Sequence, residues 1–249
     1  MNEPTKYSLD LPPFHFVDFA AFGETESLPL SKIQKLTGAY LSRNWVAIPQ
    51  VTHHDEADIT NLDIYRKQLA EETGVRLTPL AFIMKAMCKA LSEFPKFNAS
   101  LDLSGNNLIL KKYFHIGVAV DTPAGLLVAV IRDCDKKTTT DLAEEILTLS
   151  SKAREKGLPM SSMVGGCMTV SSLGHIGGTA FSPIINAPEV AILGITKAQW
   201  KPVRNGNEIE WRFMLPLSLT YDHRVINGVD AAKFSAFVAE ALSKPEDLL

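Results

Sequence analysis

The residues best suited to chemistry stand together in the run Asp222-His-Arg-Val-Ile-Asn-Gly228. A neutral histidine accepts a proton near neutral pH, so His223 is a candidate general base. The side chains around it, Asp222, Arg224 and Asn227, are able to orient an imidazole or to bind a charged partner. A histidine that is only hydrogen-bonded within a turn has the same pattern, so the run by itself leaves both interpretations open.

Apolar spacing indicates the elements that position this run. Five segments have the spacing of helices, with Thr78-Pro79 and Asp141 as candidate caps at the start of two of them. The expected helices are 31–47, 60–72, 78–94, 141–156 and 229–242. Runs of β-formers predict strands at 108–113, 116–120, 126–131, 168–172, 190–195, 209–213 and 215–221. His223 is therefore expected between the last strand and the last helix.

The order of these elements predicts the fold class. Helices and strands alternate irregularly, and hairpin turns are expected at 121–125 and at Asn205-Gly206. This order favours an α/β fold with helices packed on a mixed β-sheet, and disfavours a doubly wound nucleotide-binding fold. We expect one domain at 31–249, an N-terminal arm at 14–30 and a residual linker at 1–13.

Composition restricts the function classes further. The chain has 249 residues and a formal net charge of −3, which argues against a nucleic-acid or other polyanion binder. Its apolar runs are far shorter than the roughly 18 to 20 residues that span a bilayer, so no membrane association is expected. Three widely separated cysteines and no recognisable signal peptide indicate a reducing, cytoplasmic location.

Two other runs are weaker candidates for a site. His53 and His54 precede two acids, but adjacent residues of a strand point to opposite faces, so a solvated edge is favoured over a metal site. The run Gly174-His-Ile-Gly-Gly178 has neither a phosphate-loop lysine nor dinucleotide spacing, and it indicates a turn. We expect no metal.

Several blocks of the chain resemble a single family. Besides the run at 222–228, they are Leu41-Ser-Arg-Asn-Trp45, Phe97-Asn-Ala-Ser100, His115-Ile-Gly-Val-Ala-Val-Asp-Thr122, Gly165-Gly-Cys-Met-Thr-Val-Ser-Ser172 and Asn186-Ala-Pro-Glu-Val-Ala-Ile192. From Leu11 onward the chain resembles the dihydrolipoamide acyltransferases of 2-oxoacid dehydrogenase complexes, most of all the bacterial pyruvate dehydrogenase acetyltransferases. The resemblance implies that 31–249 is an acyltransferase catalytic domain with a chloramphenicol-acetyltransferase-like fold. It also implies trimers whose active sites lie between subunits.

The resemblance assigns roles to individual residues. His223 would take the proton of the coenzyme A thiol, and Ser171, which precedes it by 52 residues, would donate a hydrogen bond to the tetrahedral oxyanion. Asn227 stands where many members carry aspartate, so we expect it to act through geometry rather than charge. The positions implied to contact coenzyme A are Arg66, Thr78, Asp121 and Ser172. Without the resemblance, these are a solvated helix residue, a helix cap, a turn residue and a strand-end serine.

The implied activity is transfer of an acetyl group from S-acetyldihydrolipoamide to coenzyme A. A separate lipoyl domain would supply the lipoyl group. The trimers would form a cubic 24-mer, or alternatively a dodecahedral 60-mer, as the core of a pyruvate dehydrogenase complex. Pyruvate dehydrogenase and dihydrolipoamide dehydrogenase would be held by segments that this chain lacks. We expect the apolar C-terminus, Leu248-Leu249, to serve contacts between trimers.

Two other functions stay open on the sequence alone. A small-molecule O-acetyltransferase acting on an antibiotic hydroxyl would share the base and the serine, but it would need a pocket for a rigid aromatic acceptor. A scaffold that keeps the fold for assembly without turnover has no physical need for His223, Ser171 and Gly228.

Overall fold

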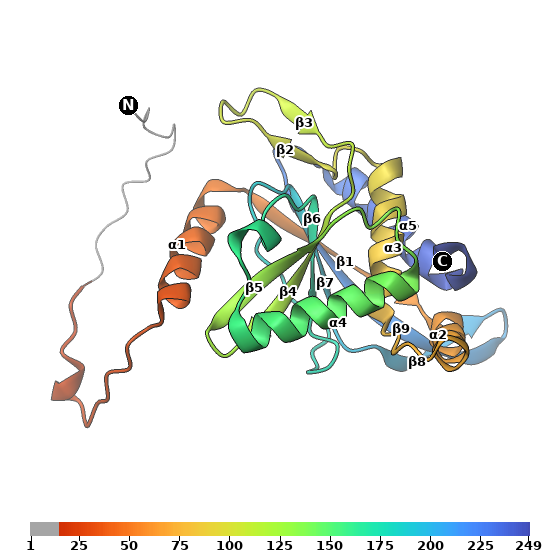
Figure 1. Cartoon of the computed structure of the whole chain (residues 1–249), viewed down its shortest axis with the longest axis horizontal. Helices are drawn as coiled ribbons and strands as arrows, with labels where there is room; N and C mark the ends of the chain where they lie inside the picture. Colours follow the sequence, from red (N-terminus) through yellow and green to blue (C-terminus); the bar gives the residue numbers. More distant parts are fainter. Residues whose placement is uncertain (1–14) are drawn as a thin grey trace.

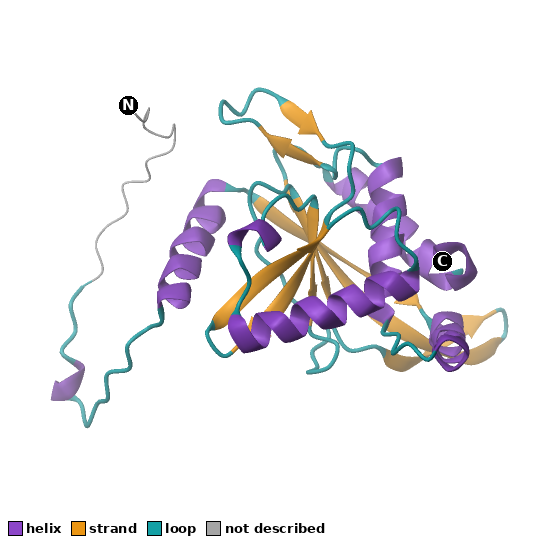
Figure 2. Ribbon diagram, in the orientation of Figure 1, coloured by secondary structure: helices purple, strands orange, loops and turns teal. Residues whose placement is uncertain are grey.

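A mixed seven-stranded β-sheet forms the centre of the molecule, of which the computed structural model describes residues 15–249 (Figure 2). Six strands lie in the order β1, β9, β7, β6, β4, β5, and β8 pairs with the first half of the long strand β9. The hairpin of β2 and β3 forms a separate small sheet. The strands are β1 (Gln50–Asp58), β2 (Ala99–Leu101), β3 (Leu108–Leu110), β4 (Ile116–Thr122), β5 (Gly125–Ile131), β6 (Met168–Ser172), β7 (Ala191–Ile195), β8 (Gln199–Asn205) and β9 (Glu208–Asp222).

Strand direction gives the sheet two distinct ends. Strands β4, β6 and β7 run parallel to one another, and β5 is antiparallel to β4. Strand β9 is antiparallel to both β7 and β1, so β1 runs in the same direction as β7. The C-terminal ends of β1, β4, β6 and β7 therefore meet at one end of the sheet, and β9 ends at the opposite end. The expected mixed sheet is confirmed.

The helices bury the apolar core against this sheet. They are α1 (Lys32–Ala47), α2 (Thr60–Thr73), α3 (Pro79–Glu93), α4 (Thr139–Lys156) and α5 (Gly228–Ser243). Helix α3 packs on both α4 and α5, while α4 also packs on β4 and β5 and α5 on β1. Helix α3 is buried on most of its surface, and even its Lys85 is enclosed, with Nζ donating to the carbonyls of Asp135 and Lys137. Helix α1 stands apart from this core and contacts β5 (Figure 1).

The helix starts differ in detail from those expected. Thr138, not Asp141, caps α4: the Asp141 N–H donates to the Thr138 hydroxyl, and the Asp141 carboxylate accepts the Thr138 N–H, each at 3.1 Å. The two hydrogen bonds form a reciprocal capping box, and the N-cap lies three residues before the expected one. Thr78 does occupy the cap position of α3 with Pro79 following, but its side chain makes no capping hydrogen bond.

The strands also differ from the expected set. The segments 209–213 and 215–221 are one strand, β9, because its first half pairs with β8 and its second half with β1 and β7. The 108–113 run is a strand only over Leu108–Leu110. The Asn205-Gly206 turn joins β8 to β9, with Gly206 in the left-handed region at φ +62°. Strand β8 escaped detection because Pro202 and exposed polar residues interrupt its apolar pattern.

The N-terminal expectations fall partly outside the described structure. The expected linker, 1–13, and residue 14 are not among the described residues. In the expected arm, Phe19–Ala21 form a short 3-10 turn, and no residue of 15–30 is buried. Within 15–249, no helix has both the length and the apolar character that crossing a bilayer requires.

The expectation that Leu248 and Leu249 both serve contacts between trimers is wrong for Leu248. Leu248 is fully buried in the chain's own core, and its carbonyl accepts the Thr139 hydroxyl hydrogen at the start of α4. Only Leu249, which is 55% exposed, remains available to a partner. The contact of the final turn (Pro245–Leu248) with α2, α3 and α5 explains the difference, because that turn packs back onto the helices.

Substitution of the two leucines should separate these roles. Leu248→Ala should lower the free energy of unfolding by roughly 2 to 5 kcal/mol, because it leaves a cavity in the core. Leu249→Ala, as the matched control, should change it by less than about 0.5 kcal/mol. Urea unfolding followed by circular dichroism measures both. Equal effects of the two substitutions would contradict the burial of Leu248.

Candidate active site

The His223 turn is held in place by the strands on both sides of β9. The His223 N–H donates to the carbonyl of Pro49, just before β1, at 3.0 Å. The N–H of the preceding residue, Asp222, donates to the carbonyl of Val190, just before β7, at 2.9 Å. The His223 side chain is exposed, with its ring centroid 5.8 Å from that of Tyr221. The backbone of the turn is therefore fixed while the imidazole is accessible.

Asp222 and Arg224 brace this turn as an ion pair. The Arg224 guanidinium donates to both Asp222 carboxylate oxygens, at 2.9 Å from Nε to Oδ1 and 2.6 Å from Nη2 to Oδ2. Asp222 is only 2% exposed, and its backbone carbonyl accepts the N–H groups of Val225 and Ile226. A buried carboxylate that is paired and hydrogen-bonded in this way holds the turn on either side of His223.

Asn227 connects the turn to the last helix. Its Oδ1 accepts the N–H of Asp230 at 2.9 Å, which makes Asn227 the N-cap of α5. Asp230 in the first turn adds a negative charge where the helix dipole favours one. The structure therefore places the Asn227 amide on the helix end, four residues after His223.

Ser171 lies at the other end of the sheet from His223. It is half-buried near the C-terminal end of β6, opposite Gly194 of β7. Since Ala191 of β7 pairs with Tyr221 of β9, continuing this register places residue 189 opposite His223, five positions before Gly194. At ~3.3 Å per residue, the two side chains are about 17 Å apart along the strands. One copy of the chain does not bring Ser171 and His223 together.

The expected coenzyme A positions lie towards the Ser171 end of the sheet. Ser172 and Asp121 are near the C-terminal ends of the parallel strands β6 and β4, and Asp121 is exposed on the hairpin that leads into β5. Helix α2, which carries Arg66, begins two residues after β1 ends at that same end. Arg66 donates to the Asp63 carboxylate and to the carbonyl of Leu77, which places its guanidinium beside Thr78.

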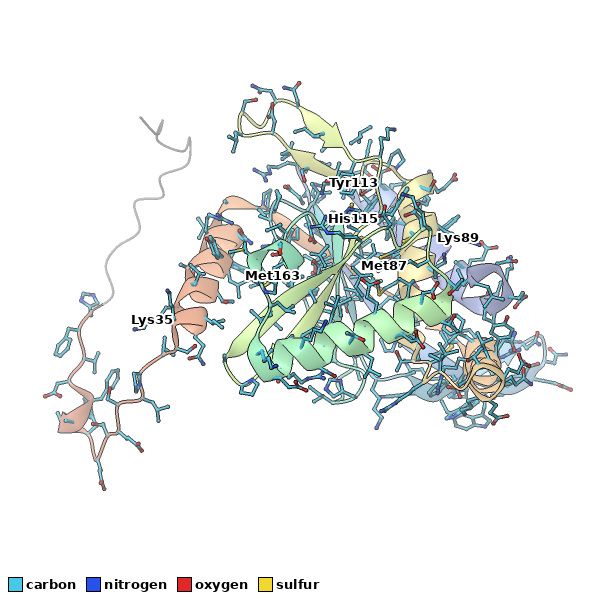
Figure 3. The ribbon with its side chains drawn as sticks, viewed as in Figure 1. Lys35, Met87, Lys89, Tyr113, His115 and Met163 are labelled. Atoms are coloured by element: carbon cyan, nitrogen blue, oxygen red, sulfur yellow. The ribbon has the colours of Figure 1, made fainter. Side chains whose placement is uncertain are left out.

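Two histidines outside this run, His54 and His115, have structural partners. His54 Nδ1 lies 3.0 Å from the Ser218 hydroxyl across the β1–β9 pairing, on an edge strand of the sheet as expected. His115 accepts the Asp133 N–H on Nδ1 at 3.0 Å, and its ring centroid lies 4.5 Å from that of Tyr113 (Figure 3). Within 15–249, no three His, Cys, Asp or Glu side chains gather as metal ligands.

Glu189 is a residue at the His223 end that the sequence analysis missed. It is 3% exposed, and its Oε1 accepts hydrogen bonds from the Thr169 hydroxyl at 2.9 Å and the Asn186 amide at 3.3 Å. Burial raises the pKa of the Glu189 carboxyl to about 7, which the hydrogen bonds from Thr169 and Asn186 only partly offset. The available signal was an acid directly before the apolar run 190–195.

Comparison with known proteins identifies close relatives of the chain. Residues 22–249 match the model of the 2-oxoacid dehydrogenases acyltransferase (catalytic domain) family. The chain is 52% identical over 240 residues to the dihydrolipoyllysine-residue acetyltransferase component of the Haemophilus influenzae pyruvate dehydrogenase complex, and 53% identical over 238 residues to that of Cupriavidus necator. Each alignment covers 94% of this chain but only 42% and 43% of the relatives, so the chain spans less than half of their length.

Solved structures agree with this similarity. Azotobacter vinelandii dihydrolipoamide acetyltransferase superposes with a TM-score of 0.93 at 50% identity, over 96% of this chain and 99% of that chain. It was solved to establish the role of a serine, a histidine and an asparagine in its catalytic mechanism, and the three are spaced as Ser171, His223 and Asn227 are here. A chloramphenicol acetyltransferase matches with a TM-score of 0.55 at 18% identity, over 78% of this chain and 89% of that chain, which shows the shared fold.

The raised pKa of Glu189 predicts a pH-dependent stability. Its folded-state pKa of about 7 lies above the ordinary value of 4.5. The stabilisation from this group is therefore complete below about pH 4.5 and is lost as the pH rises through about 7. We expect a loss on the order of 2 to 3 kcal/mol by pH 8.5, which Glu189→Gln should abolish.

Thermal unfolding at pH 5.5 and 8.5 measures this difference. The control is Glu71→Gln, which removes an exposed carboxyl of α2. If the unfolding midpoint of Glu189→Gln falls between pH 5.5 and 8.5 by as much as that of the wild type, Glu189 does not titrate in this range.

Proposed function

The chain belongs to the family of 2-oxoacid dehydrogenase acyltransferase catalytic domains, and we propose that it transfers an acetyl group from S-acetyldihydrolipoamide to coenzyme A. The acetyl donor would be carried by a lipoyl domain on a separate part of the complete protein. The relatives that support this proposal are named dihydrolipoyllysine-residue acetyltransferases of pyruvate dehydrogenase complexes. The chain spans less than half of the length of these relatives, and the proposal concerns the acetyl transfer alone.

His223 acts as the general base in this proposal. A coenzyme A thiol with an ordinary pKa near ~8.5 is mostly protonated at neutral pH, so attack needs a base that removes its hydrogen. The accessible imidazole accepts that proton as the sulfur attacks the thioester carbonyl carbon. When the tetrahedral intermediate breaks its bond to the lipoyl sulfur, the imidazolium returns the proton to the departing thiolate. The products are acetyl-CoA and dihydrolipoamide, and His223 is regenerated.

Ser171 stabilises the oxyanion of the intermediate, and it does so from a neighbouring copy of the chain. The observation that carries this proposal is the separation of Ser171 and His223 to opposite ends of one sheet. Each copy thus carries the base, His223, at one end of the sheet and the oxyanion donor, Ser171, at the other. A complete site then forms where His223 of one copy meets Ser171 of the next. The match in spacing to the serine and histidine of the Azotobacter vinelandii enzyme supports the same pair.

The remaining residues bind and orient. Asn227 holds the His223 turn at the start of α5, which is a role of geometry and needs no charge. We assign coenzyme A contacts to Arg66, Thr78, Asp121 and Ser172, all towards the Ser171 end. The Arg66 guanidinium is the natural partner for the phosphate or adenine side of the coenzyme.

The assembly that fits this proposal is a homotrimer that builds a larger particle. A structural relative of this chain, with a TM-score of 0.93, forms the cubic core of a pyruvate dehydrogenase multienzyme complex, which favours a 24-mer over a 60-mer. Its partners would be the lipoyl domain, pyruvate dehydrogenase and dihydrolipoamide dehydrogenase, in the cytoplasm. The segments that bind these enzymes are not assigned to any part of this chain.

Loss of either half of the site should abolish most of the activity. In an assay of acetyl exchange between acetyl-CoA and free dihydrolipoamide, His223→Ala should reduce kcat by roughly 10² to 10⁴, because the general base is lost. Ser171→Ala should reduce it by about 10² to 10³, because an oxyanion donor is lost. His53→Ala is a matched control on β1 and should retain activity. An inactive wild type, or near-normal turnover of His223→Ala, would refute the proposal.

A shared site predicts complementation between two inactive variants. When His223→Ala and Ser171→Ala chains are unfolded together and refolded as a 1:1 mixture, about a quarter of the interfaces in a random cyclic trimer pair an intact His223 with an intact Ser171. Exchange activity should recover towards about a quarter of wild type. No recovery in particles that contain both variants would place both residues in a site within one copy.

A further inference from the structure

Glu189 lies between the two catalytic elements of a single chain. It lies two residues before β7 and next to Val190, whose carbonyl accepts the N–H of Asp222 at the end of β9. Its side chain reaches β6, where the Thr169 hydroxyl donates to Glu189 Oε1 at 2.9 Å. Thr169 and Ser171 are two residues apart on β6 and therefore point to the same face of the sheet. One buried side chain thus links the strand of Ser171 to the strand end of His223.

Two glycines leave room for this link. A Cβ atom at Gly166 would lie 2.7 Å from Glu189 Oε1, and one at Gly117 would lie 2.5 Å from the Thr169 hydroxyl oxygen. Both distances are shorter than real Cβ contacts, and neither glycine has a positive φ. A side chain at Gly166 would therefore displace the Glu189 carboxyl, and one at Gly117 would displace both the Thr169 hydroxyl and the Val128 side chain.

Burial of the Glu189 carboxyl costs free energy that an apolar side chain at this position would not cost. Glu189 Oε2 is buried without a hydrogen-bond partner among the described residues. Lys111, in the segment after β3, lowers the pKa of the carboxyl electrostatically, but burial outweighs this effect, and the carboxyl in turn raises the pKa of the Cys167 thiol. The Lys111 ammonium donates instead to the carbonyls of Ala99 and Gly166. A buried carboxyl in this state costs more than an apolar side chain of the same size.

We propose that Glu189 is a positioning residue, which through Thr169 and the β7–β9 register sets where each copy presents Ser171 and His223 to its neighbours. The inference rests on the proposed function. Misplacing a catalytic group by about 1 Å costs ~10²-fold in rate, so a link that holds both strands has a direct effect on turnover. Substrate binding, which lies mainly with other residues, changes little.

Removal and conservative replacement of the hydroxyl test the link at Thr169. Thr169→Val keeps the shape and removes the donor, so kcat for acetyl exchange should fall at least tenfold while KM for coenzyme A changes less than threefold. Thr169→Ser keeps the donor and should retain kcat within about threefold of wild type. Particle size and far-ultraviolet circular dichroism establish that the compared proteins are folded. A Thr169→Val enzyme with more than half of the wild-type kcat, or a Thr169→Ser enzyme as impaired as Thr169→Val, would overturn the proposal.

A second variant keeps the test decisive if Thr169→Val does not assemble. Glu189→Gln preserves an acceptor for Thr169 but cannot ionise. Glu189→Gln should therefore retain kcat within about threefold of wild type, whereas Glu189→Leu, which removes the acceptor at similar size, should lower kcat at least tenfold. Equal kcat values for these two variants would overturn the proposal. In both tests an active wild type and an inactive His223→Ala enzyme show that the proposed function itself holds.

Discussion

The hydrogen-bonded register between β7 and β9 is the constraint on which the candidate site depends. It aligns Ala191 with Tyr221 and directs the Asp222 N–H to the carbonyl of Val190. A slip by one residue would move the turn by about 3.3 Å and send each side chain of β9 to the other face of the sheet. Because β1 pairs with the same half of β9 from the other side, the strand end that carries His223 is held by two neighbours.

Two carboxyl groups are buried near this strand end, and they differ in the charge of their hydrogen-bond partners. Asp222 is paired with the Arg224 guanidinium, which ties its carboxylate to the turn. Glu189 has only neutral donors within hydrogen-bond distance, and its pKa rises accordingly. The first carboxylate has a cation directly beside it, whereas the second lacks one within hydrogen-bond distance and is sensitive to pH near neutrality. The imidazole of His223, which follows Asp222, is exposed to solvent, as its proposed role as a general base requires.

Local patterns predicted the fold well where short-range contacts decide it. The hairpin of β4 and β5, the helix stop at Gly74 with φ +71° and the start of α5 after Asn227 all follow from residues within one turn of each other. Predictions were wrong where a distant partner decides. Strand β8 exists because β9 pairs with it despite Pro202, and Leu248 is buried because the final turn packs onto α2, α3 and α5.

The sequence by itself determined the family and the candidate residues: a histidine between groups that can brace it, a serine at a fixed distance along the chain, and blocks that match one family. These are statements about residue identity and order, which the covalent chain carries directly. Tertiary structure alone decided that Ser171 and His223 lie at opposite ends of one sheet and that Glu189 is enclosed beside Thr169. Strand order, register and burial depend on contacts between segments far apart in the sequence, so a local sequence pattern does not predict them.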